Sequence, residues 1–320
     1  MSEFELIQQF FTERQSAVSY VPLGIGDDCA LMRARAGMQL AISTDMLVEG
    51  RHFFPGADAR MLGHKALAVN LSDLAAMGAE PRAFTLALAL PDADQDWLRN
   101  FSQGLFELAA LHSCQLIGGD TTRGPRNISI TVLGEIPDGL ALRRDGAQAG
   151  DDIWVSGSLG EARLALAGCL REQILSEAEL QLASLRLHQP TPRIALGLGL
   201  RTIAHAAIDI SDGLAGDLGH ILKRSHLGAT LWCEDLPVGE VLRTRDRSLQ
   251  IEFALAGGDD YELCFTAPRH RRSDVLALAR SVATPLTRIG FTQTEMGLRI
   301  VDQQNKSITF LSSSFDHFQS

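Results

Sequence analysis

Residues 59–90, ARMLGHKALAVNLSDLAAMGAEPRAFTLALAL, contain a long helical pattern that is followed closely by a strand pattern. The first part, residues 59–79, is rich in alanine and other small residues, which suits a helix packed closely on several sides. The second part, residues 82–90, is a short apolar run typical of a buried strand. The succession of helix and strand predicts an α/β or α+β chain.

The same alternation extends in both directions from this stretch. Strands are expected at 38–44, 114–118, 127–136, 206–211, 229–234, 261–267 and 297–302, and helices at 95–112, 160–171, 176–187, 193–205 and 212–225. A polar, glycine-containing connection at 142–158 interrupts the series and leads into a new strand. We therefore expect two α/β domains, 1–145 and 146–320, with a ligand-binding cleft at their junction.

Composition narrows the class of protein. Hydrophobic residues make up 45% of the 320 residues and charged residues 21%, which is close to the average of globular proteins. The net charge of -10 argues against a nucleic-acid or anionic-membrane partner. No run reaches the roughly 18 apolar residues of a membrane span, and residues 1–15 resemble an amphipathic helix rather than a signal peptide. The five cysteines form no C-x-x-C pair, so we expect a reduced, cytoplasmic protein without a zinc site.

Aspartates recur where apolar runs give way to Gly, Ser or Thr. They are Asp27, Asp28, Asp45, Asp120, Asp209, Asp212, Asp259 and Asp260. One interpretation of each motif is an ordinary turn, because Asp and Gly are both common turn residues. That interpretation fits less well for Asp209, which is flanked by isoleucines in an expected strand. It also fits less well for Asp73, which shares a helical face with Asn70 and Met77.

The other interpretation is a carboxylate cluster that binds several magnesium ions. Ionised carboxylates are costly to gather in a buried place unless positive charge compensates them. Magnesium supplies such charge and typically takes one or two protein carboxylates together with water and phosphate oxygens. Small residues before each aspartate let the backbone approach a phosphate closely. Taken as a set, the motifs predict a magnesium- and nucleotide-binding site.

The familiar ATP-binding motifs are missing from the sequence. No G-x-x-x-x-G-K-[ST] loop occurs, nor does the glycine-rich loop and H-R-D set of protein kinases. ATP would therefore have to bind through a different architecture.

Seven motifs follow one another along the chain: GIGDDCA, AISTDMLVEGRHF, KALAVNLSDLAAMGA, LIGGDTTRG, IDISDGLAGDLGH, GGDDYELCFT and the terminal FDHF. In their order and approximate spacing they resemble the thiamine-monophosphate kinase family. That family belongs to the ATP-binding superfamily of aminoimidazole-ribonucleotide synthetase and selenophosphate synthetase. The resemblance implies a two-domain α/β (α+β) fold and a homodimer in which two N-terminal mixed sheets form a shared barrel. It also implies ATP-dependent phosphorylation of thiamine monophosphate to thiamine diphosphate.

The resemblance further implies roles for individual residues. The implied magnesium ligands are Asp28, Ser43, Thr44, Asp45, Asp73, Asp120, Asp209 and Asp212, of which Asp45, Asp120 and Asp209 are expected to act in catalysis. The implied ATP contacts are Gly119, Asp120, Arg144 and Ser211. The implied contacts to the thiamine substrate are His52, Asp259 and Phe315.

Several of these assignments have alternatives. His52 could be an ordinary loop histidine, and Arg123 or Arg143 could contact phosphate in place of Arg144. Asp259 stands where the family often has a glutamate, so its reach toward the substrate is shorter.

Two other functions compete with the kinase. One is a different enzyme of the same superfamily, such as a selenophosphate synthetase, although no cysteine precedes Cys29. The other is an acidic metal- or nucleotide-binding protein without turnover. The presence of every acidic motif favours the kinase over the second alternative.

Overall fold

The computed structural model describes residues 3–12 and 18–308, which form two compact units. One unit contains the residues up to Leu74 together with Ala79–Gly139, and the other contains Ala75–Gly78 and the residues from Leu140 onward. The boundary expected at 145 lies shortly after Gly139, in the connection that follows the last strand of the first unit.

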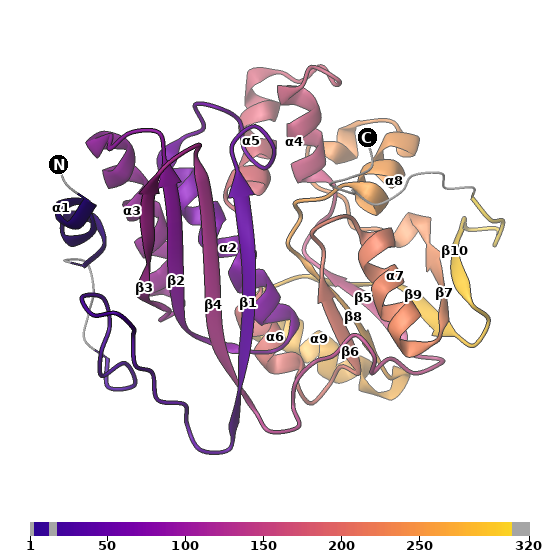
Figure 1. Ribbon diagram of the computed structural model, residues 1–320. Coiled ribbons are helices and arrows are strands. Elements are labelled where there is room, and N and C mark those ends of the chain that lie inside the picture. Colours follow the sequence, from indigo (N-terminus) through magenta and orange to yellow (C-terminus); the bar gives the residue numbers. More distant parts are fainter. Residues whose placement is uncertain (1–2, 13–17, 309–320) are drawn as a thin grey trace. The chain divides into compact units, whose positions relative to one another are not determined.

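The first unit is a mixed sheet with helices on one face (Figure 1). Its elements are α1 (Glu3–Ile7), the π-helical turn η1 (Gln8–Thr12), β1 (Met38–Val48), α2 (Ala59–Ala76), β2 (Glu80–Leu90), α3 (Gln95–Leu111), β3 (Gln115–Arg123) and β4 (Asn127–Pro137). The strand order is β1-β4-β2-β3, so β1 and β3 are the two edges. β2 and β3 run parallel, whereas β4 is antiparallel to both of its neighbours.

Buried and more exposed side chains alternate along β2, and the buried ones identify the face of the sheet that the helices cover. Phe84, Leu86 and Leu88 alternate along β2 and are buried, and α2 and α3 lie over one face of this sheet (Figure 1). The two helices approach closely, because a Cβ atom added at Gly63 would lie only 2.1 Å from the Phe101 carbonyl oxygen. Small residues in 59–79 therefore serve tight helix packing, as expected from the sequence.

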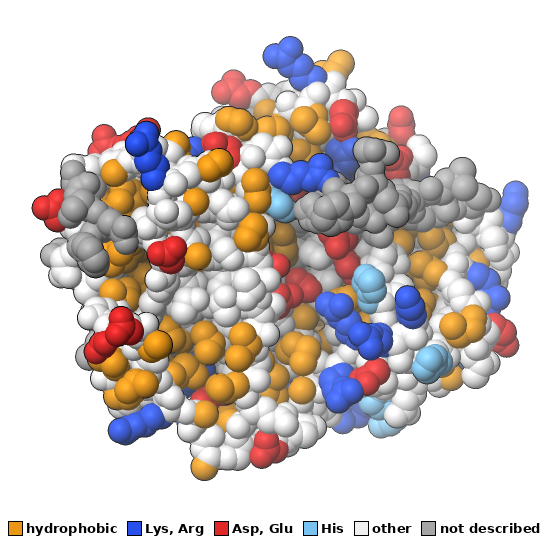
Figure 2. Space-filling view, viewed as in Figure 1, with side chains coloured by type: hydrophobic (Ala, Val, Ile, Leu, Met, Phe, Trp, Pro, Cys, Tyr) orange, Lys and Arg blue, Asp and Glu red, His pale blue; other side chains and the backbone are white. Residues whose placement is uncertain are grey.

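The opposite side of this sheet, which we call the open face, carries exposed apolar side chains. Leu40, Ile42 and Met46 alternate along the edge strand β1 and are 47%, 62% and 52% exposed. Hydrophobic side chains are also visible across this face in the space-filling view (Figure 2). Exposed apolar side chains on an edge strand are a typical site for association with another chain.

The second unit is a six-stranded sheet in the order β10-β7-β9-β5-β8-β6. Its strands are β5 (Asp152–Ser156), β6 (Ala206–Asp209), β7 (Gly228–Trp232), β8 (Leu263–Ala267), β9 (Leu286–Gln293) and β10 (Gly297–Val301). Its α-helices are α4 (Glu161–Cys169), α5 (Glu177–His188), α6 (Ile194–Leu200), α7 (Leu214–Ser225), α8 (Arg247–Ala256) and α9 (Arg272–Ser281). Short 3-10 turns are η2 (Cys233–Asp235), η3 (Leu242–Thr244) and η4 (Arg269–Arg271).

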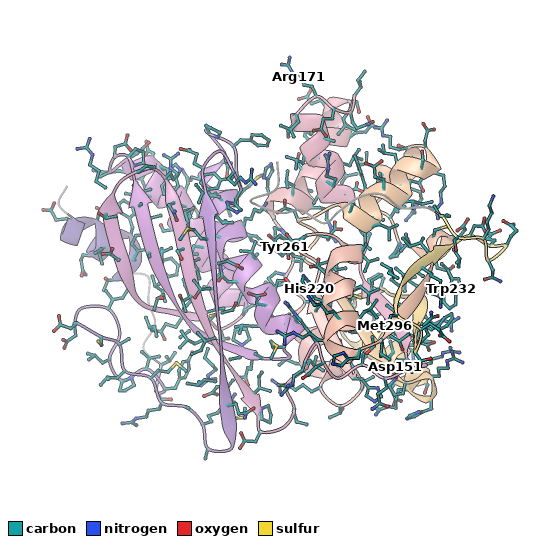
Figure 3. All side chains as sticks on the ribbon, turned by 45° about the vertical axis from the view of Figure 1, so that its right-hand side comes forward. Asp151, Arg171, His220, Trp232, Tyr261 and Met296 are labelled. Carbon is teal, nitrogen blue, oxygen red and sulfur yellow. The ribbon has the colours of Figure 1, made fainter. Side chains whose placement is uncertain are left out.

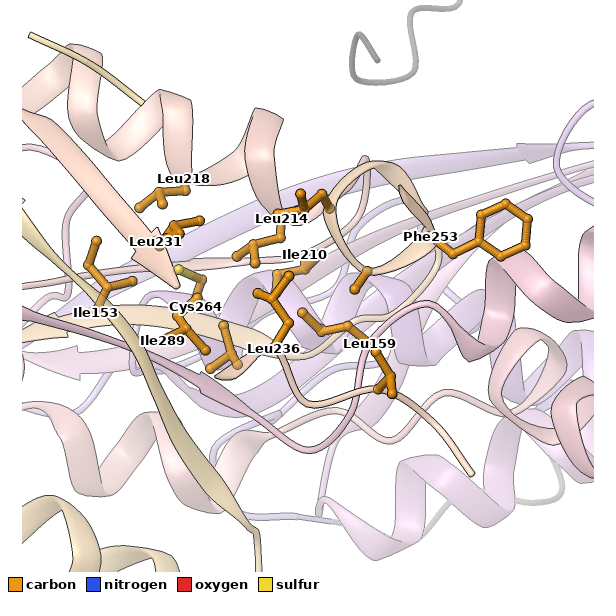
Figure 4. Packing of buried hydrophobic residues seen from close by; sticks show 14 of the residues in the cluster. Ile153, Leu159, Ile210, Leu214, Leu218, Leu231, Leu236, Phe253, Cys264 and Ile289 are labelled. Atoms are coloured by element: carbon orange, nitrogen blue, oxygen red, sulfur yellow. The ribbon is translucent and has the colours of Figure 1, made fainter. Parts of the chain in front are cut away.

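The main core of this unit lies between the sheet and α7. Leu214 and Leu218 of α7 belong to the same buried cluster as Ile153, Leu231 and Ile289 on the strands (Figure 4). The apolar positions of α7 recur with helical spacing, so one face of α7 covers the sheet. This packing fixes the start of α7 and with it the turn that follows β6.

The observed elements differ from the expected ones in a few places. β1 continues to Val48, so Asp45 lies inside a strand rather than after one. The helix expected at 193–205 ends at Leu200, and the strand β9 and the helices α8 and α9 were not expected. Among the described helices, none combines the length and apolar character needed to cross a membrane.

Candidate functional site

Ser43, Asp45 and Asp73 meet where β1 crosses α2. Ser43 Oγ donates a hydrogen bond of 2.5 Å to Asp73 Oδ2. The backbone N–H of Asp45 donates to Asn70 Oδ1 at 3.1 Å, and Asn70 Nδ2 in turn donates to the Ala66 carbonyl oxygen. Asn70 is 1% exposed, so a buried amide fixes the backbone that carries Asp45. These contacts join Ser43 to Asp73 and hold the backbone of Asp45 against α2 in the first unit.

Thr44 points to the open face instead. Its hydroxyl lies 2.8 Å from the hydroxyl of Thr131 on β4. Successive residues of a strand face opposite sides, so Thr44 cannot share the helix-facing side with Ser43 and Asp45.

Asp120 lies far from Ser43, Asp45 and Asp73 within the first unit. It is exposed on the edge strand β3. Across the sheet it is in register with Ala87 of β2, Ser129 of β4 and Met46 of β1. Because Met46 lies on the open face, Asp120 lies on the open face as well. Three strand spacings separate β3 from β1, a distance of about 14 Å. The first unit of one chain therefore does not bring Asp120 to the corner of Asp45 and Asp73.

Gly119, the residue before Asp120, is required by its surroundings. Its φ is +152°, and an added Cβ atom would lie 1.8 Å from the Leu86 carbonyl oxygen on the neighbouring strand. Only a residue without a side chain allows β2 and β3 to approach in this way.

Asp28 lies on an exposed loop formed by an N-terminal hairpin. Leu31 N donates to the Leu23 carbonyl oxygen at 2.8 Å, and Arg33 N donates to the Tyr20 carbonyl oxygen at 2.8 Å. Asp28 N donates to Asp27 Oδ1 at 2.8 Å, so Asp27 supports the turn that carries Asp28. Both aspartates are exposed.

The hairpin is anchored to the sheet by a buried carboxylate. Glu135 is fully buried, and Arg35 binds it through both its backbone N–H (2.9 Å) and Nε (2.5 Å). Burial alone would raise the pKa of Glu135, but the Arg35 and Arg82 interactions outweigh burial and hold that pKa below its usual value. Tyr20 completes the anchor by donating from its hydroxyl to the Arg82 carbonyl oxygen at 3.1 Å.

His52 closes the turn that follows β1. Its Nδ1 accepts a hydrogen bond of 3.0 Å from the backbone N–H of Val48. A neutral imidazole that accepts at Nδ1 carries its proton on Nε2, which makes Nε2 the donor. His52 can thus donate to an anionic group from a fixed ring orientation.

In the second unit, the turn between β6 and α7 carries Asp209, Ser211 and Asp212. Asp209 ends β6 and is 5% exposed, and Ser211 and Asp212 are partly exposed. The backbone N–H groups of Ser211 and Asp212 both donate to Asp217 Oδ2 at 3.1 Å. Burial raises the pKa of Asp217 to about 7.

A second turn, residues 258–262, runs alongside the first. Ile210 N donates to the Glu262 carbonyl oxygen, Tyr261 N to the Ile210 carbonyl oxygen and Asp259 N to the Ser211 carbonyl oxygen, at 2.8, 2.8 and 2.9 Å. These bonds extend the antiparallel pairing of β6 and β8 into both turns. The turn with Asp259 and the turn with Asp212 are therefore joined by their backbones.

Asp259 and Tyr261 both adopt the left-handed conformation, with φ of +66° and +48°. Asp260 lies between them and Glu262 follows them, and both bind neighbouring parts of the unit. Asp260 is buried and accepts from Gly160 N at 3.0 Å, and burial raises its pKa well above the usual value. Glu262 is 1% exposed and binds Arg186, Arg193 and Ser156. Two buried acids thus hold two strained residues in place.

Arg144 is exposed, and its carbonyl oxygen accepts from Ser225 Oγ at 2.9 Å, which ties its loop to the end of α7. Arg143 pairs with Asp145 and Arg123 donates to the Pro91 carbonyl oxygen. Phe315 lies outside the described residues.

The donors suit magnesium. All the expected ligands are carboxylate or hydroxyl oxygens, which magnesium prefers, and none is a sulfur or an imidazole nitrogen. Within residues 3–12 and 18–308, no three His, Cys, Asp or Glu side chains are already gathered as a ready metal site. The oxygens of the expected magnesium ligands lie instead in separate pairs and turns.

Sequence reasoning missed the supports of these residues. Asn70 was expected on the same face as Asp73 but not as a hydrogen-bond partner of Asp45. The sequence motifs predict no role for Asp217 or Glu262, although an acid within the apolar pattern of 212–225 is a visible signal for Asp217.

Comparison with known proteins gives matches along nearly the whole chain. Residues 26–136 match the family described as AIR synthase related protein, N-terminal domain, and residues 148–303 match its C-terminal domain. The thiamine-monophosphate kinase of Salmonella typhimurium is 46% identical over 319 residues, which cover 99% of this chain and 98% of that protein.

Two solved structures are also similar. The crystal structure of thiamine-monophosphate kinase from Stenotrophomonas maltophilia K279a superimposes with a TM-score of 0.87 and is 48% identical, covering 94% of this chain and 96% of the other. The structure of AaThiL complexed with AMPPCP and TMP has a TM-score of 0.78 and 30% identity, covering 99% of this chain and 97% of the other.

Proposed function

Because the chain belongs to the thiamine-monophosphate kinase family of AIR synthase related proteins, we propose that it transfers the γ-phosphoryl group of ATP to thiamine monophosphate. The products are thiamine diphosphate and ADP, and the reaction is the last step of thiamine diphosphate biosynthesis. The observation that carries this proposal is 46% identity to a thiamine-monophosphate kinase over 99% of the chain.

The nucleophile in this reaction is the phosphate group of the acceptor. Its second pKa is near 6, so it is largely dianionic at neutral pH and needs no general base. The difficulty is to bring two polyanions together, and catalysis of phosphoryl transfer consists mostly of positioning and charge stabilisation. A chain with many carboxylates and few candidate bases at its site fits this requirement.

Magnesium, when bound, would supply the positive charge that neutralises both substrates. The residues proposed to hold it are Asp28, Ser43, Thr44, Asp45, Asp73, Asp120, Asp209 and Asp212. Asp45, Asp120 and Asp209 are proposed to lie nearest the reacting phosphates. Support for these roles comes from the all-oxygen donor set and from the backbone supports of Asp45 and Asp212.

The substrate contacts are proposed on similar grounds. Gly119, Asp120, Arg144 and Ser211 are proposed to contact ATP, and His52, Asp259 and Phe315 the thiamine substrate. The Nε2–H of His52 is oriented by the Nδ1 contact to Val48 and could donate to the acceptor phosphate. Residues 1–145 would then form the ATP-, magnesium- and dimer-binding domain, and 146–320 would complete the active-site cleft.

We further propose that the protein is a homodimer formed through the open face. In the described part of the chain, β1 pairs with β4 alone, which leaves its other edge without a strand partner. Leu40, Ile42 and Met46 would be buried if the open faces of two sheets closed into a barrel.

This arrangement would also account for the position of Asp120. A barrel of two such sheets can join β1 of one chain to β3 of its partner, since β1 and β3 are the two edges of each sheet, and we propose this pairing. The partner's Asp120 would then lie beside Thr44 and Asp45, so that each active site would draw its ligands from both chains.

A cytoplasmic location is proposed from the nature of the substrates and the reduced cysteines. The decisive assay measures ADP release with thiamine monophosphate, thiamine and an aminoimidazole-pathway precursor as alternative acceptors, and detects the new diphosphate by phosphorus NMR. Turnover with thiamine monophosphate alone is expected. Turnover only with unphosphorylated thiamine, or with none of the three, would contradict the proposal.

Variants connect that activity to the carboxylates. Asp209→Asn and Asp73→Asn are each expected to abolish turnover while the protein still folds. Normal activity of both variants at low magnesium would exclude the proposed metal ligands.

A further inference from the structure

Asp217 lies in the first turn of α7 and points back toward the turn that follows β6. Its side chain is 4% exposed, and it belongs to neither the expected metal ligands nor the expected substrate contacts. One of its oxygens, Oδ2, accepts hydrogen bonds from both Ser211 N and Asp212 N at 3.1 Å. A single buried oxygen therefore binds two consecutive backbone N–H groups.

These contacts change what the start of α7 can bind. Backbone N–H groups at the beginning of a helix usually form a site for anions such as phosphate. The N-cap residue of α7, Gly213, provides no side-chain cap, and Asp217 binds the N–H groups of the preceding turn from within the helix. With these two N–H groups directed at Asp217, the turn is suited to presenting oxygen ligands to a cation.

The turn is restrained from its other side as well. The Ser211 carbonyl oxygen accepts from Asp259 N, and the Ile210 carbonyl oxygen accepts from Tyr261 N. Gly213 has a φ of +113°, and an added Cβ atom would lie 2.9 Å from the Ala256 backbone. Backbone contacts on one side and Asp217 on the other leave the turn little freedom.

We propose that Asp217 is a positioning residue that sets the metal affinity of the turn bearing Asp209, Ser211 and Asp212. It acts by keeping the two N–H groups pointed inward, so that the side chains of the turn are held ready for a divalent cation. This inference rests on the proposed function, because it assumes that the turn binds the cation that accompanies ATP. Residues that orient metal ligands commonly change metal affinity by about 10- to 100-fold when they are removed.

Two variants of Asp217 separate the effect of its hydrogen bonds from the effect of its charge. Both hydrogen bonds end on the same oxygen, and the amide oxygen of an asparagine can occupy that place. Asp217→Asn therefore keeps the two contacts and loses the charge, whereas Asp217→Ala loses both.

The experiment measures Mn²⁺ binding to the full-length protein in the presence of the ATP analogue AMPPCP, with free Mn²⁺ followed by electron paramagnetic resonance. We expect Asp217→Ala to weaken Mn²⁺ binding by about 10-fold or more, and Asp217→Asn to stay within about threefold of the unchanged protein. Wild-type affinity in Asp217→Ala would overturn the proposal. Equal loss in both variants would also overturn it, because charge rather than hydrogen bonding would then be responsible.

Asp151→Ala is the matched control. Asp151 is also buried (3% exposed), belongs to the same unit, and accepts from the backbone N–H of Gln148 at 2.9 Å and from His205. It lies away from Tyr261 and the joined turns (Figure 3). We expect this control to lower the melting temperature without changing Mn²⁺ affinity, and a matching loss of Mn²⁺ affinity would assign the effect of Asp217→Ala to general destabilisation.

The Mn²⁺ binding measurement does not depend on the phosphate acceptor. Mn²⁺ binding with AMPPCP requires no thiamine monophosphate, so failure of the kinase assay with the unchanged protein would refute the proposed function alone. An intact kinase with unchanged Mn²⁺ affinity in Asp217→Ala would refute only the role of Asp217.

Discussion

Asp45 and Asp120 lie on opposite edges of one four-stranded sheet and point to its opposite faces. If both act in one active site, we expect the two residues to come from different chains, because about 14 Å separates β1 from β3 within one sheet. Co-expression of Asp45→Asn and Asp120→Asn chains with different tags would yield a heterodimer with one intact and one doubly altered site. We expect each homodimer to be inactive and the heterodimer to recover about half the activity of the unchanged dimer. An inactive heterodimer would place both residues in the same site of one chain.

Association through the open face can be tested at Ile42, whose side chain is 62% exposed on β1. Ile42→Asp introduces a charge that a buried barrel interior would not tolerate, so we expect monomers in light scattering. Ile174→Asp is the matched control, because Ile174 is 93% exposed in the other unit and is expected to leave the dimer intact. A dimer that persists in Ile42→Asp would locate the interface elsewhere.

Asn70 is expected to matter for both stability and metal binding. Asn70→Ala removes the side-chain acceptor of the Asp45 N–H in a buried place and one of the donors to the Ala66 carbonyl oxygen, which keeps its helical backbone bond. The expected loss in free energy of unfolding is about 1–3 kcal/mol, measured by urea denaturation. The magnesium concentration for half-maximal activity should rise at the same time, and a stability loss alone would show that Asn70 does not orient Asp45.

Variants of Asp259 can distinguish the conformational strain of this residue from its proposed contact with the substrate. Its φ of +66° is unfavourable for most residues by about 1–2 kcal/mol, although Asp and Asn tolerate it better than others. Asp259→Gly is therefore expected to be at least as stable as the unchanged protein but to have a higher KM for thiamine monophosphate. Asp259→Asn keeps the conformational tolerance and removes the charge. An unchanged KM in both variants would exclude Asp259 from substrate binding.

The pH dependence of stability can be examined at Asp152, which is 1% exposed. Burial raises the pKa of this carboxyl, but contacts from Arg272 (2.8 Å) and Arg288 (3.4 Å) outweigh burial and lower that pKa below its ordinary value. A lowered pKa stabilises the folded state above the unfolded-state pKa of about 3.9, and this stabilisation is lost as the pH falls through the folded-state pKa.

Asp152→Asn should therefore unfold more easily at neutral pH, by about 1–3 kcal/mol. The difference from the unchanged protein should shrink as the pH falls below about 4. Chemical denaturation at a series of pH values measures this, and a constant difference would mean that packing rather than ionisation is responsible.

The order of helices and strands was accessible from hydrophobic periodicity, because residues such as Phe84, Leu86 and Leu88 repeat with the spacing of their element. β9 was less visible, since Thr287 and Arg288 interrupt its apolar pattern. The placement of Asp120 on the far edge depends on the strand order β1-β4-β2-β3, which is a long-range property that no local pattern contains. The family resemblance predicted candidate acids, but not that Asn70 binds the backbone N–H of Asp45 or that Asp217 binds those of Ser211 and Asp212.

The backbone bonds between Ile210–Ser211 and Asp259–Glu262 have a practical consequence for inhibition. A compound with one group for the first turn and another for the second would meet two surfaces whose spacing is already fixed by the protein. Such a ligand would not need to order its target on binding, so a rigid linker of the correct length should bind more tightly than a flexible one.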